Sequence, residues 1–347
     1  MNRQELLSLL RSTDPAVVSD LTREAGMVRD EAVGRAVYLR GLVEFSNYCR
    51  RGCTYCGIYC NNRTITRYRM TGAEILRCAE AIQSYGIGTV VLQSGEDPFF
   101  TGPKMAAIVA SVKEKTGLAV TLSLGERPFE DLKLWREAGA DRYLLRFETS
   151  DQKLFSKIHP SATVPLPGRI EQLHLLRDLG YEVGSGIMTG FPGQTCASVA
   201  DDLLLFRQLD LDMIGIGPYV PHPGTPMADQ ETDITIDDQL PNTLATAYKT
   251  VALTRILCPS INMPCTTALR TIDPAGYREG LRAGCNVIMP NVTPLDYSER
   301  YDIYPGKKRV AQFEQALDLV EKEVTDAGCF VASGAGASRH FRERSCN

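Results

Sequence analysis

The residues VYLRGLVEFSNYCRRGCTYCG, from Val37 to Gly57, join an apolar run to a cysteine-rich loop. The apolar run, 37–45, is typical of a strand that is buried on both faces of a parallel sheet. Further runs of this kind follow along the chain, and a helical pattern separates each from the next. They are 88–95, 117–125, 141–148, 181–190, 212–220, 260–268 and 284–291.

The alternation of strand and helix gives eight units and predicts an α/β fold, a (β/α)8 TIM barrel. A doubly wound open sheet is the alternative. We expect a helical N-terminal extension over 1–35, the barrel over 36–306, and a C-terminal helical cap and tail over 307–347. The Gly/Ser/Ala-rich stretch 332–347 is expected to be a loosely ordered end.

The composition limits the cellular location and the classes of binding partner that we expect. A net charge of −4 gives no basis for binding nucleic acid or an acidic membrane. We find no signal peptide and no apolar run of the roughly 18 residues that a membrane helix needs. Eleven cysteines, an odd number, indicate the reducing cytosol, so we expect a cytoplasmic protein. Isolated cysteines are expected to fill the core: Cys78, Cys196, Cys258, Cys265 and Cys285.

The loop after the first strand carries the spacing Cys49-X3-Cys53-X2-Cys56, with Gly52 easing the turn. Three thiolates so close together can hold three irons of a [4Fe–4S] cube and leave the fourth iron open, whereas ordinary electron-transfer clusters use four cysteines. Cys60 offers a fourth ligand, so a four-cysteine cluster stays open. A zinc site also stays open, although zinc ligands usually come as separated pairs.

Polar residues crowd the ends of the predicted strands, which in a barrel of this type form the rim where active sites lie. Arg146 and Glu148 alternate with apolar residues at the end of the fourth strand. An unpaired charge is costly in such a buried position, so the pair favours a ligand there. A salt bridge between the two side chains is the alternative interpretation.

The cysteine spacing, with Tyr55 before the last cysteine and a barrel pattern after it, resembles the radical S-adenosylmethionine (SAM) superfamily. In that superfamily SAM chelates the open iron of the cluster, and one electron cleaves it to methionine and a 5′-deoxyadenosyl radical. The cofactor carries the difficult chemistry and the protein orients it. The resemblance therefore implies one [4Fe–4S] cluster and SAM as cofactors.

Longer blocks narrow the resemblance to HydE, the family of radical maturases of the [FeFe]-hydrogenase active site. They include VVLQSGEDPFF (90–100), VTLSLGERP (120–128) and DMIGIGPYVPHPGTP (212–226), and such blocks extend over about 40–307. Methylornithine synthase is a similar sibling family. A radical mutase that acts on an amino acid is thus the alternative enzyme, and an iron–sulfur carrier without catalysis is a third possibility.

The resemblance implies roles for individual residues. Cys49, Cys53 and Cys56 would be the cluster ligands, with Cys60 a non-ligand. The residues expected to contact SAM are Tyr55, Ser94, Gly95, Glu96, Glu148, Arg169, Pro218 and Val220.

The resemblance also implies the substrate, a small anionic cysteine-bound iron with carbonyl and cyanide ligands, whose sulfur the adenosyl radical attacks. Partners would be a reductant such as ferredoxin or flavodoxin, and other hydrogenase maturases. For the two methionines among the expected substrate contacts, packing in the barrel core is the alternative. These contacts are Thr121, Ser123, Arg142, Arg146, Met213, Thr266, Thr267, Met289 and Tyr304.

Two features depart from the family pattern. Some members hold a second cluster through a C-terminal C-X7-C-X2-C, but here the region after Tyr304 has no cysteine before Cys329. We therefore expect a single cluster. Arg270 stands where a small residue is expected, so it signals either tighter anion binding or a different substrate. His222, between two prolines, is expected to be structural.

Overall fold

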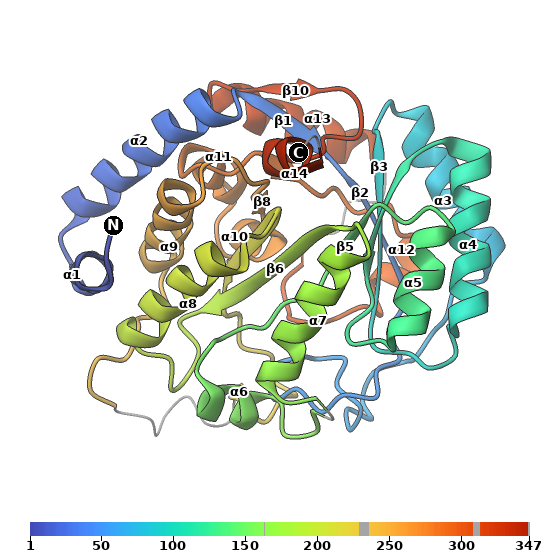
Figure 1. Cartoon of the computed structure of the whole chain (residues 1–347), viewed down its shortest axis with the longest axis horizontal. Coiled ribbons are helices and arrows are strands. Elements are labelled where there is room, and N and C mark those ends of the chain that lie inside the picture. The colour runs from blue at the N-terminus through green and yellow to red at the C-terminus, as the bar shows by residue number, and fades with distance from the viewer. Residues whose placement is uncertain (163, 229–235, 308–312, 346–347) are drawn as a thin grey trace.

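The computed structural model describes the chain except for residues 163, 229–235, 308–312 and 346–347. The strands form one parallel sheet in the order β10-β1-β9-β8-β7-β6-β5-β4-β3-β2. Figure 1 shows this sheet curling inside a layer of helices. The strands are β1 Ala36–Leu39, β2 Gly41–Ser46, β3 Thr89–Ser94, β4 Ala119–Ser123, β5 Arg142–Leu144, β6 Glu182–Thr189, β7 Met213–Pro218, β8 Pro264–Cys265, β9 Val287–Ile288 and β10 Phe330–Ala332.

Backbone hydrogen bonds join the two ends of the curled sheet. β1 pairs with β9, and beyond β9 the amide of Leu42 donates to the carbonyl of Pro290 at 2.8 Å. The amide of Val292 then donates back to the carbonyl of Leu42, also at 2.8 Å. The predicted TIM-barrel fold is thus confirmed. The first predicted strand is broken at Arg40, because β1 pairs with β9 and β10 while β2 pairs with β3.

Most of the helices cover the outside of the sheet (Figure 1). Their ends follow local signals: Thr71 and Glu74 form a capping box at the start of α3, and Gly117 ends α4 in the left-handed conformation. After the two N-terminal helices, the chain forms α3 Gly72–Ser84, α4 Gly102–Thr116, α5 Phe129–Glu137, α6 Gln152–Ile158, α7 Leu166–Asp178, α8 Cys196–Leu209, α9 Leu244–Leu257, α10 Thr267–Ile272, α11 Gly276–Arg282, α12 Leu295–Ser298, α13 Phe313–Asp326 and α14 Arg339–Ser345.

The N-terminal extension consists of α1 Arg3–Arg11 and α2 Pro15–Ala32, which lie over α8 and α9 (Figure 1). The ammonium group of Lys249 on α9 donates to the carbonyls of Leu10 and Ser12, at 2.7 Å each. This buried lysine satisfies carbonyls that the end of α1 leaves without partners. In the described part of the chain, no helix is both long and apolar enough to cross a membrane.

Apolar side chains of the strands and the inner faces of the helices form one main core. The prediction that isolated cysteines fill this core is confirmed for the four that are buried. Cys258 is only partly buried and packs against the core. The buried four are Cys78, Cys196, Cys265 and Cys285.

The expectation of a loosely ordered end at 332–347 is wrong for the residues that the structure describes. β10 pairs with β1, and the following segment crosses the N-terminal end of the barrel. The carbonyl of Ala335 accepts from Arg142 at 2.9 Å, and the amide of Ser338 donates to Glu182 at 3.0 Å. The small residues are a packing requirement, since a Cβ on Gly336 would lie 2.4 Å from the Tyr38 ring.

Candidate functional site

The cysteine loop follows β2 at the C-terminal rim of the barrel. Cys49, Cys53 and Cys56 are half-buried thiols, whereas Cys60 is exposed, and all four are free. Burial raises the pKa of Cys56 to about 12 and the pKa of Cys53 well above its ordinary value. Such thiols become thiolates when a metal binds, because metal ligation displaces the proton. Three thiols on one loop are the kind of donor that an iron–sulfur cluster takes, whereas in the described part of the chain no three His, Cys, Asp or Glu side chains converge on a single metal ion.

Two arginines, the buried Arg51 and the partly buried Arg67, hold this loop in place. Arg51 donates from Nε to Glu96 at 2.5 Å, and its Nη2 also bonds to Glu126. Arg67 donates to the backbone carbonyls of Ile58 and Tyr59, at 2.8 and 2.7 Å. The loop is thereby fixed to the ends of β3 and β4 without using its sulfur atoms. Sequence reasoning did not assign Arg51, Arg67 or Glu126 to the site.

Close packing explains several glycines around the loop. A Cβ on Gly95 would lie 2.3 Å from the Tyr48 carbonyl oxygen, so β3 approaches the loop at a distance that only glycine allows. Gly52 was expected to ease a turn, but it is absent from the left-handed glycines. Instead its amide donates to the hydroxyl of Ser161, and a Cβ there would lie 3.0 Å from that oxygen.

His222 is a structural residue of the rim, as expected. A Cβ on Gly57 would lie 2.5 Å from its Nε2 atom. The same nitrogen lies 3.3 Å from a carboxylate oxygen of Asp302, and Nδ1 accepts from the amide of Gly224 at 3.1 Å. The histidine thus links the loop after β7 to the segment before α13.

Glu148 lies at the rim in a strained backbone conformation, with φ at 64°. Its buried carboxylate accepts from Arg146 Nη2 at 2.9 Å, and both side chains line the barrel cavity. Burial raises the pKa of Glu148, and Arg146 opposes that shift. The salt bridge of the alternative interpretation forms, and since both residues also line the cavity, a ligand contact stays a prediction. Strain of this kind is typical of functional sites.

Arg169, expected to bind the carboxylate of SAM, is already engaged by another carboxylate. It donates to Glu126 Oε1 from Nε at 2.8 Å and from Nη2 at 2.6 Å. Its Nη1 atom donates to the carbonyl of Arg146 at 2.9 Å. Glu126 therefore joins Arg169 on α7 to Arg51 in the cysteine loop.

Tyr55 bonds to a histidine that the sequence did not single out. The hydroxyl lies 3.1 Å from Nε2 of His159, and Nδ1 of the same ring lies 3.2 Å from the Phe155 carbonyl. Burial lowers the pKa of His159 to about 3, so the ring is neutral at ordinary pH. A neutral ring that donates from Nδ1 to the carbonyl accepts at Nε2 from Tyr55.

A cavity of about 230 Å³ occupies the barrel next to the cysteine loop. It brings together residues that were predicted separately from the cysteine loop and from the strand ends. From the predicted set, it is lined by Cys56, Tyr55, Glu148, Pro218, Val220, Ser123, Arg146, Thr266, Thr267, Met289 and Tyr304.

Other predicted residues are absent from the described lining of this cavity. Arg142 donates to Glu182 at 2.5 Å in the buried N-terminal end of the barrel. Met213 lies there as well, with its sulfur 3.0 Å from Nη1 of Arg40. The residues outside the lining are Cys49, Cys53, Ser94, Gly95, Glu96, Arg169, Thr121, Arg142 and Met213.

The cavity also has walls that sequence reasoning missed. Lys307 donates to Glu44 Oε1 at 2.5 Å, and Asn291 donates to Glu44 Oε2 at 2.8 Å. Glu44 and Lys307 both line the cavity. The apolar strand pattern hid Glu44, and Lys307 reaches the cavity only after the chain returns across the rim. Arg270 is absent from this lining, and its guanidinium lies 5.1 Å from the Tyr277 ring centre.

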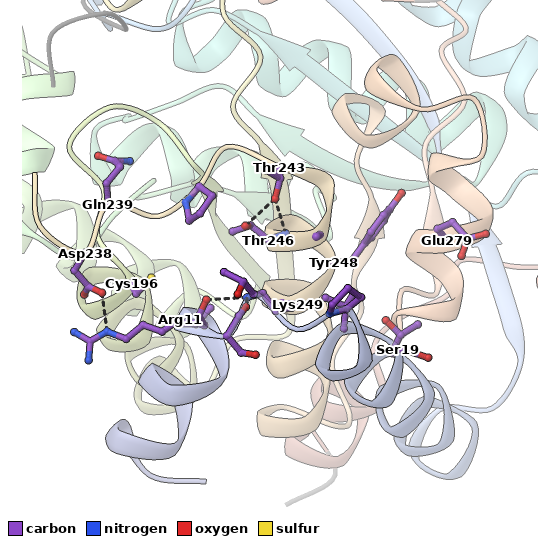
Figure 2. A pocket seen from close by; sticks show the side chains of 18 of the residues that line it. Arg11, Ser19, Cys196, Asp238, Gln239, Thr243, Thr246, Tyr248, Lys249 and Glu279 are labelled. Carbon is purple, nitrogen blue, oxygen red and sulfur yellow. Dashed lines mark hydrogen bonds and ion pairs between the residues drawn. The ribbon is translucent and has the colours of Figure 1, made fainter. Parts of the chain in front are cut away.

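A larger cavity, of about 800 Å³, lies outside the barrel between the N-terminal helices and α8, α9 and α11. Figure 2 shows Arg11 directed at Asp238, and Lys249 directed toward the end of α1. Its lining includes none of the residues predicted for the cluster, SAM or substrate. The smaller cavity is therefore the candidate active site.

Comparison with known proteins identifies the family of this chain. The family model of the radical SAM superfamily matches residues 43–206. The [FeFe] hydrogenase maturase subunit HydE of Thermotoga maritima is 46% identical over 88% of this chain and 84% of its own length. A 3-methylornithine synthase of Methanosarcina acetivorans is 28% identical over 87% of this chain and 83% of its own.

Solved structures show the same fold. The crystal structure of methylornithine synthase (PylB) matches with a TM-score of 0.81 and 25% identity, over 100% of this chain and 96% of that one. The maturase HydG of Carboxydothermus hydrogenoformans matches with a TM-score of 0.79 over 100% of this chain and 78% of its own, and at 17% identity it supports the fold alone. The chain therefore belongs to the radical SAM superfamily and, within it, to the HydE family of [FeFe] hydrogenase maturases.

Proposed function

We propose that this chain is a radical SAM maturase of the [FeFe]-hydrogenase active site that uses a single [4Fe–4S] cluster. Cys49, Cys53 and Cys56 would hold three irons, and SAM would bind the fourth. One observation carries the proposal: Cys56 and Tyr55 line the same cavity as Glu148 and Arg146. SAM bound to the open iron would thus face a cavity that contains one carboxylate, Glu148, and one guanidinium, Arg146.

The remaining contacts are proposed for the rest of SAM. Ser94, Gly95 and Glu96 end β3 beside the loop, where a Cβ on Gly95 would also touch Cys49 at 2.7 Å. Arg169 would bind the carboxylate of SAM by sharing or exchanging its present partners, Glu126 and the carbonyl of Arg146. Tyr55, Pro218 and Val220 would line the adenine side. Charged and hydrogen-bonding groups of this kind orient a cofactor that carries the reaction itself.

When bound, the cluster and SAM supply a 5′-deoxyadenosyl radical that, in this proposal, attacks the sulfur of a cysteine-bound Fe(CO)2(CN) substrate. The chain's own residues bind that substrate and exclude water. Arg146 and Lys307 supply positive charge, and Ser123, Thr266 and Thr267 supply hydroxyl groups. Because Glu148 and Glu44 already pair with these two cations, a small anion would bind by sharing the cations and by accepting hydrogen bonds from the hydroxyl groups.

A radical mutase acting on an amino acid is the second candidate, because the cavity also contains two carboxylates. Glu44 and Glu148 line it together with Arg146 and Lys307, so its charges are balanced. An amino acid with an ammonium and a carboxylate group suits such a lining. The similarity to 3-methylornithine synthases points in the same direction.

The other parts of the proposal concern organisation and partners. We assign the barrel to 36–306, with a helical extension at 1–35 and a C-terminal part at 307–347. A second cluster is not included, since after Cys285 the sequence has only Cys329 and Cys346. The chain would work in the cytoplasm with a low-potential reductant and the other hydrogenase maturases.

Anaerobic reconstitution followed by SAM cleavage tests the proposal. Under dithionite we expect 5′-deoxyadenosine and methionine in equal amounts, and a signal of the reduced cluster that changes when SAM is added. Absence of cleavage in protein with a full complement of iron would contradict enzymatic activity and favour an iron–sulfur carrier. The substrate is then tested by supplying either a cysteine–iron–carbonyl–cyanide complex or lysine. Stimulation by the complex alone supports the maturase, and stimulation by lysine alone supports the mutase.

A further inference from the structure

The cysteine loop is strongly basic in an acidic protein. Between Glu44 and Glu74 the chain contains five arginines and no acidic residue, although the whole chain has a net charge of −4. Arg51 and Arg67 are used inside the loop, as described above. Arg63 is exposed, and the side chain of Arg50 is half exposed. This distribution places positive charge on the outer side of the loop.

A stack of cations and aromatic rings extends this surface. The guanidinium of Arg69 lies 3.7 Å from the ring centre of Tyr48 and 4.7 Å from that of Phe99. The ammonium of Lys104, near the start of α4, lies 3.1 Å from the ring centre of Phe99. Phe99 is nevertheless 46% exposed. We name Tyr48, Arg50, Arg69, Phe99 and Lys104 the basic aromatic patch.

The carboxylates that accompany the patch lie beneath its cations. Asp97 accepts from Arg69 at 2.7 and 2.9 Å, and Glu96 accepts from Arg50 at 3.2 Å. Both carboxylates are buried, with exposures of 0% and 6%. An approaching protein therefore meets the arginine and lysine groups and the ring of Phe99 rather than the carboxylates.

The patch surrounds a residue that the proposed function makes a cluster ligand. Tyr48 and Arg50 flank Cys49 directly, and consecutive Cα atoms are about 3.8 Å apart. A partner seated here would approach the cluster closely, and electron transfer weakens steeply with distance. Exposed aromatic and arginine side chains are also enriched where proteins bind one another.

We propose that the basic aromatic patch is the docking surface for an acidic one-electron carrier of the flavodoxin or ferredoxin type. The inference rests on the proposed function, because it supplies the electron that SAM cleavage requires. Redox encounters are weak and use small interfaces, and opposite charges on the two partners accelerate them. A single exposed aromatic side chain, Phe99, with Arg69 and Lys104 beside it, suits such a transient contact better than a stable complex.

Two exposed residues outside the proposed cofactor and substrate site test the inference: Lys104→Glu and Phe99→Ala. A glutamate near the start of α4 also suits the helix dipole, so folding should be preserved. Each variant is assayed for 5′-deoxyadenosine formation with dithionite and with reduced flavodoxin or ferredoxin. We expect the carrier concentration for half-maximal rate to rise about fivefold or more, while the dithionite rate stays unchanged.

Matched controls lie at the other end of the barrel. Lys115→Glu makes the same charge change in the last turn of α4, and Phe330→Ala removes a ring from β10 that is 60% exposed. Both should behave like the parent with either reductant. The inference would be overturned if Lys104→Glu and Lys115→Glu lost carrier-supported activity equally. It would also be overturned if a patch variant lost as much activity with dithionite as with the carrier. A parent that cleaves SAM with dithionite but with neither carrier would overturn it too.

These outcomes are separate from a failure of the proposed function, which would appear as no cleavage with dithionite in the parent itself. A further outcome assigns the patch elsewhere: a single-stranded oligonucleotide that binds the parent tightly and loses affinity in Lys104→Glu, with unchanged carrier kinetics, would overturn the inference in favour of nucleic acid.

Discussion

Arg142 and Glu182 form an ion pair inside the N-terminal end of the barrel, with Nε and Oε2 2.5 Å apart and each residue 1% exposed. The same guanidinium donates to the carbonyl of Ala335, so the pair also anchors the C-terminal segment. The sequence led us to expect a substrate contact at Arg142. The structure instead places it in a stabilising network below the cavity.

Removal of one partner of this pair should destabilise the protein. Arg142→Met leaves buried Glu182 with the more distant cation Arg40, whose Nη2 lies 3.9 Å from Oε1, and breaking a buried pair typically costs about 3–5 kcal/mol. Urea unfolding measures the loss. The double variant Arg142→Met/Glu182→Met should recover part of it, because Arg40 then stays buried without this carboxylate. A raised KM for substrate with unchanged stability would instead return Arg142 to the substrate site.

The C-terminal segment depends on Gly336. Its φ of 57° and the 2.4 Å approach of a Cβ to Tyr38 predict that Gly336→Ala is destabilising by more than the roughly 1 kcal/mol of a left-handed alanine. Gly334→Ala is the control, because Gly334 has a φ of 88° with nothing near its Cβ position. Thermal unfolding should show the larger loss in Gly336→Ala. Equal losses would mean that the segment is not tightly packed on Tyr38.

Glu148 combines a strained backbone with a buried salt bridge. Glu148→Asn and Glu148→Gln both remove the carboxylate that pairs with Arg146, but asparagine tolerates φ near 64° better than glutamine. Glu148→Asn should therefore be more stable than Glu148→Gln, by about 1 kcal/mol or less. Both variants should bind SAM more weakly in equilibrium titrations, and Glu148→Asn should unfold at the higher temperature of the two. Unchanged SAM affinity in both would restrict Glu148 to its salt bridge with Arg146.

Asp202 gives a specific dependence of stability on pH. Burial raises its pKa from 3.8 to about 7 in the folded protein. Between these values the unfolded chain releases a proton that the folded protein keeps, so the contribution of this residue to stability falls as pH rises from about 4 to 7 and stays low above.

The variant Asp202→Asn tests this prediction, because its amide oxygen can still accept from Ser150, which donates to Oδ1 from its amide and hydroxyl at 2.5 Å each. We expect the variant to gain stability over the parent at pH 8 but not at pH 4. The neighbouring Asp201→Asn, on an exposed side chain, should show no such pH-dependent gain. A gain that is equal at both pH values would contradict the raised pKa.

The choice of cluster ligands separates Cys56 from Cys60. Cys56→Ala should abolish both iron binding and SAM cleavage after reconstitution, because the spacing and the cavity assign this thiol to the cluster. Cys60→Ala should retain both, since Cys60 lies outside the C-X3-C-X2-C spacing and its side chain is exposed. Iron content and the visible absorption of the cluster provide the measurement. Iron loss in Cys60→Ala would show that the cluster has four cysteine ligands.

The order of strands and helices and the cysteine loop could be predicted because both are local properties of the sequence. Apolar runs of strand length mark the barrel strands, and three cysteines within eight residues need no distant partner to be recognised. The residues of the rim followed from the same pattern. Thus Arg146, Glu148 and Thr266 were assigned to the cavity from their places at strand ends.

The tertiary structure alone decided how deep each residue lies along the barrel and which distant residues meet when the barrel closes. Arg142 begins β5 and Arg146 lies two residues beyond its end; they look alike in sequence, but four residues of extended chain separate them by about 13 Å. One consequently reaches the cavity and the other the closed end. Lys307, Glu126 and the segment around Gly336 meet their partners only when the barrel closes. Contacts between residues far apart in the chain depend on that closure, which no local pattern encodes.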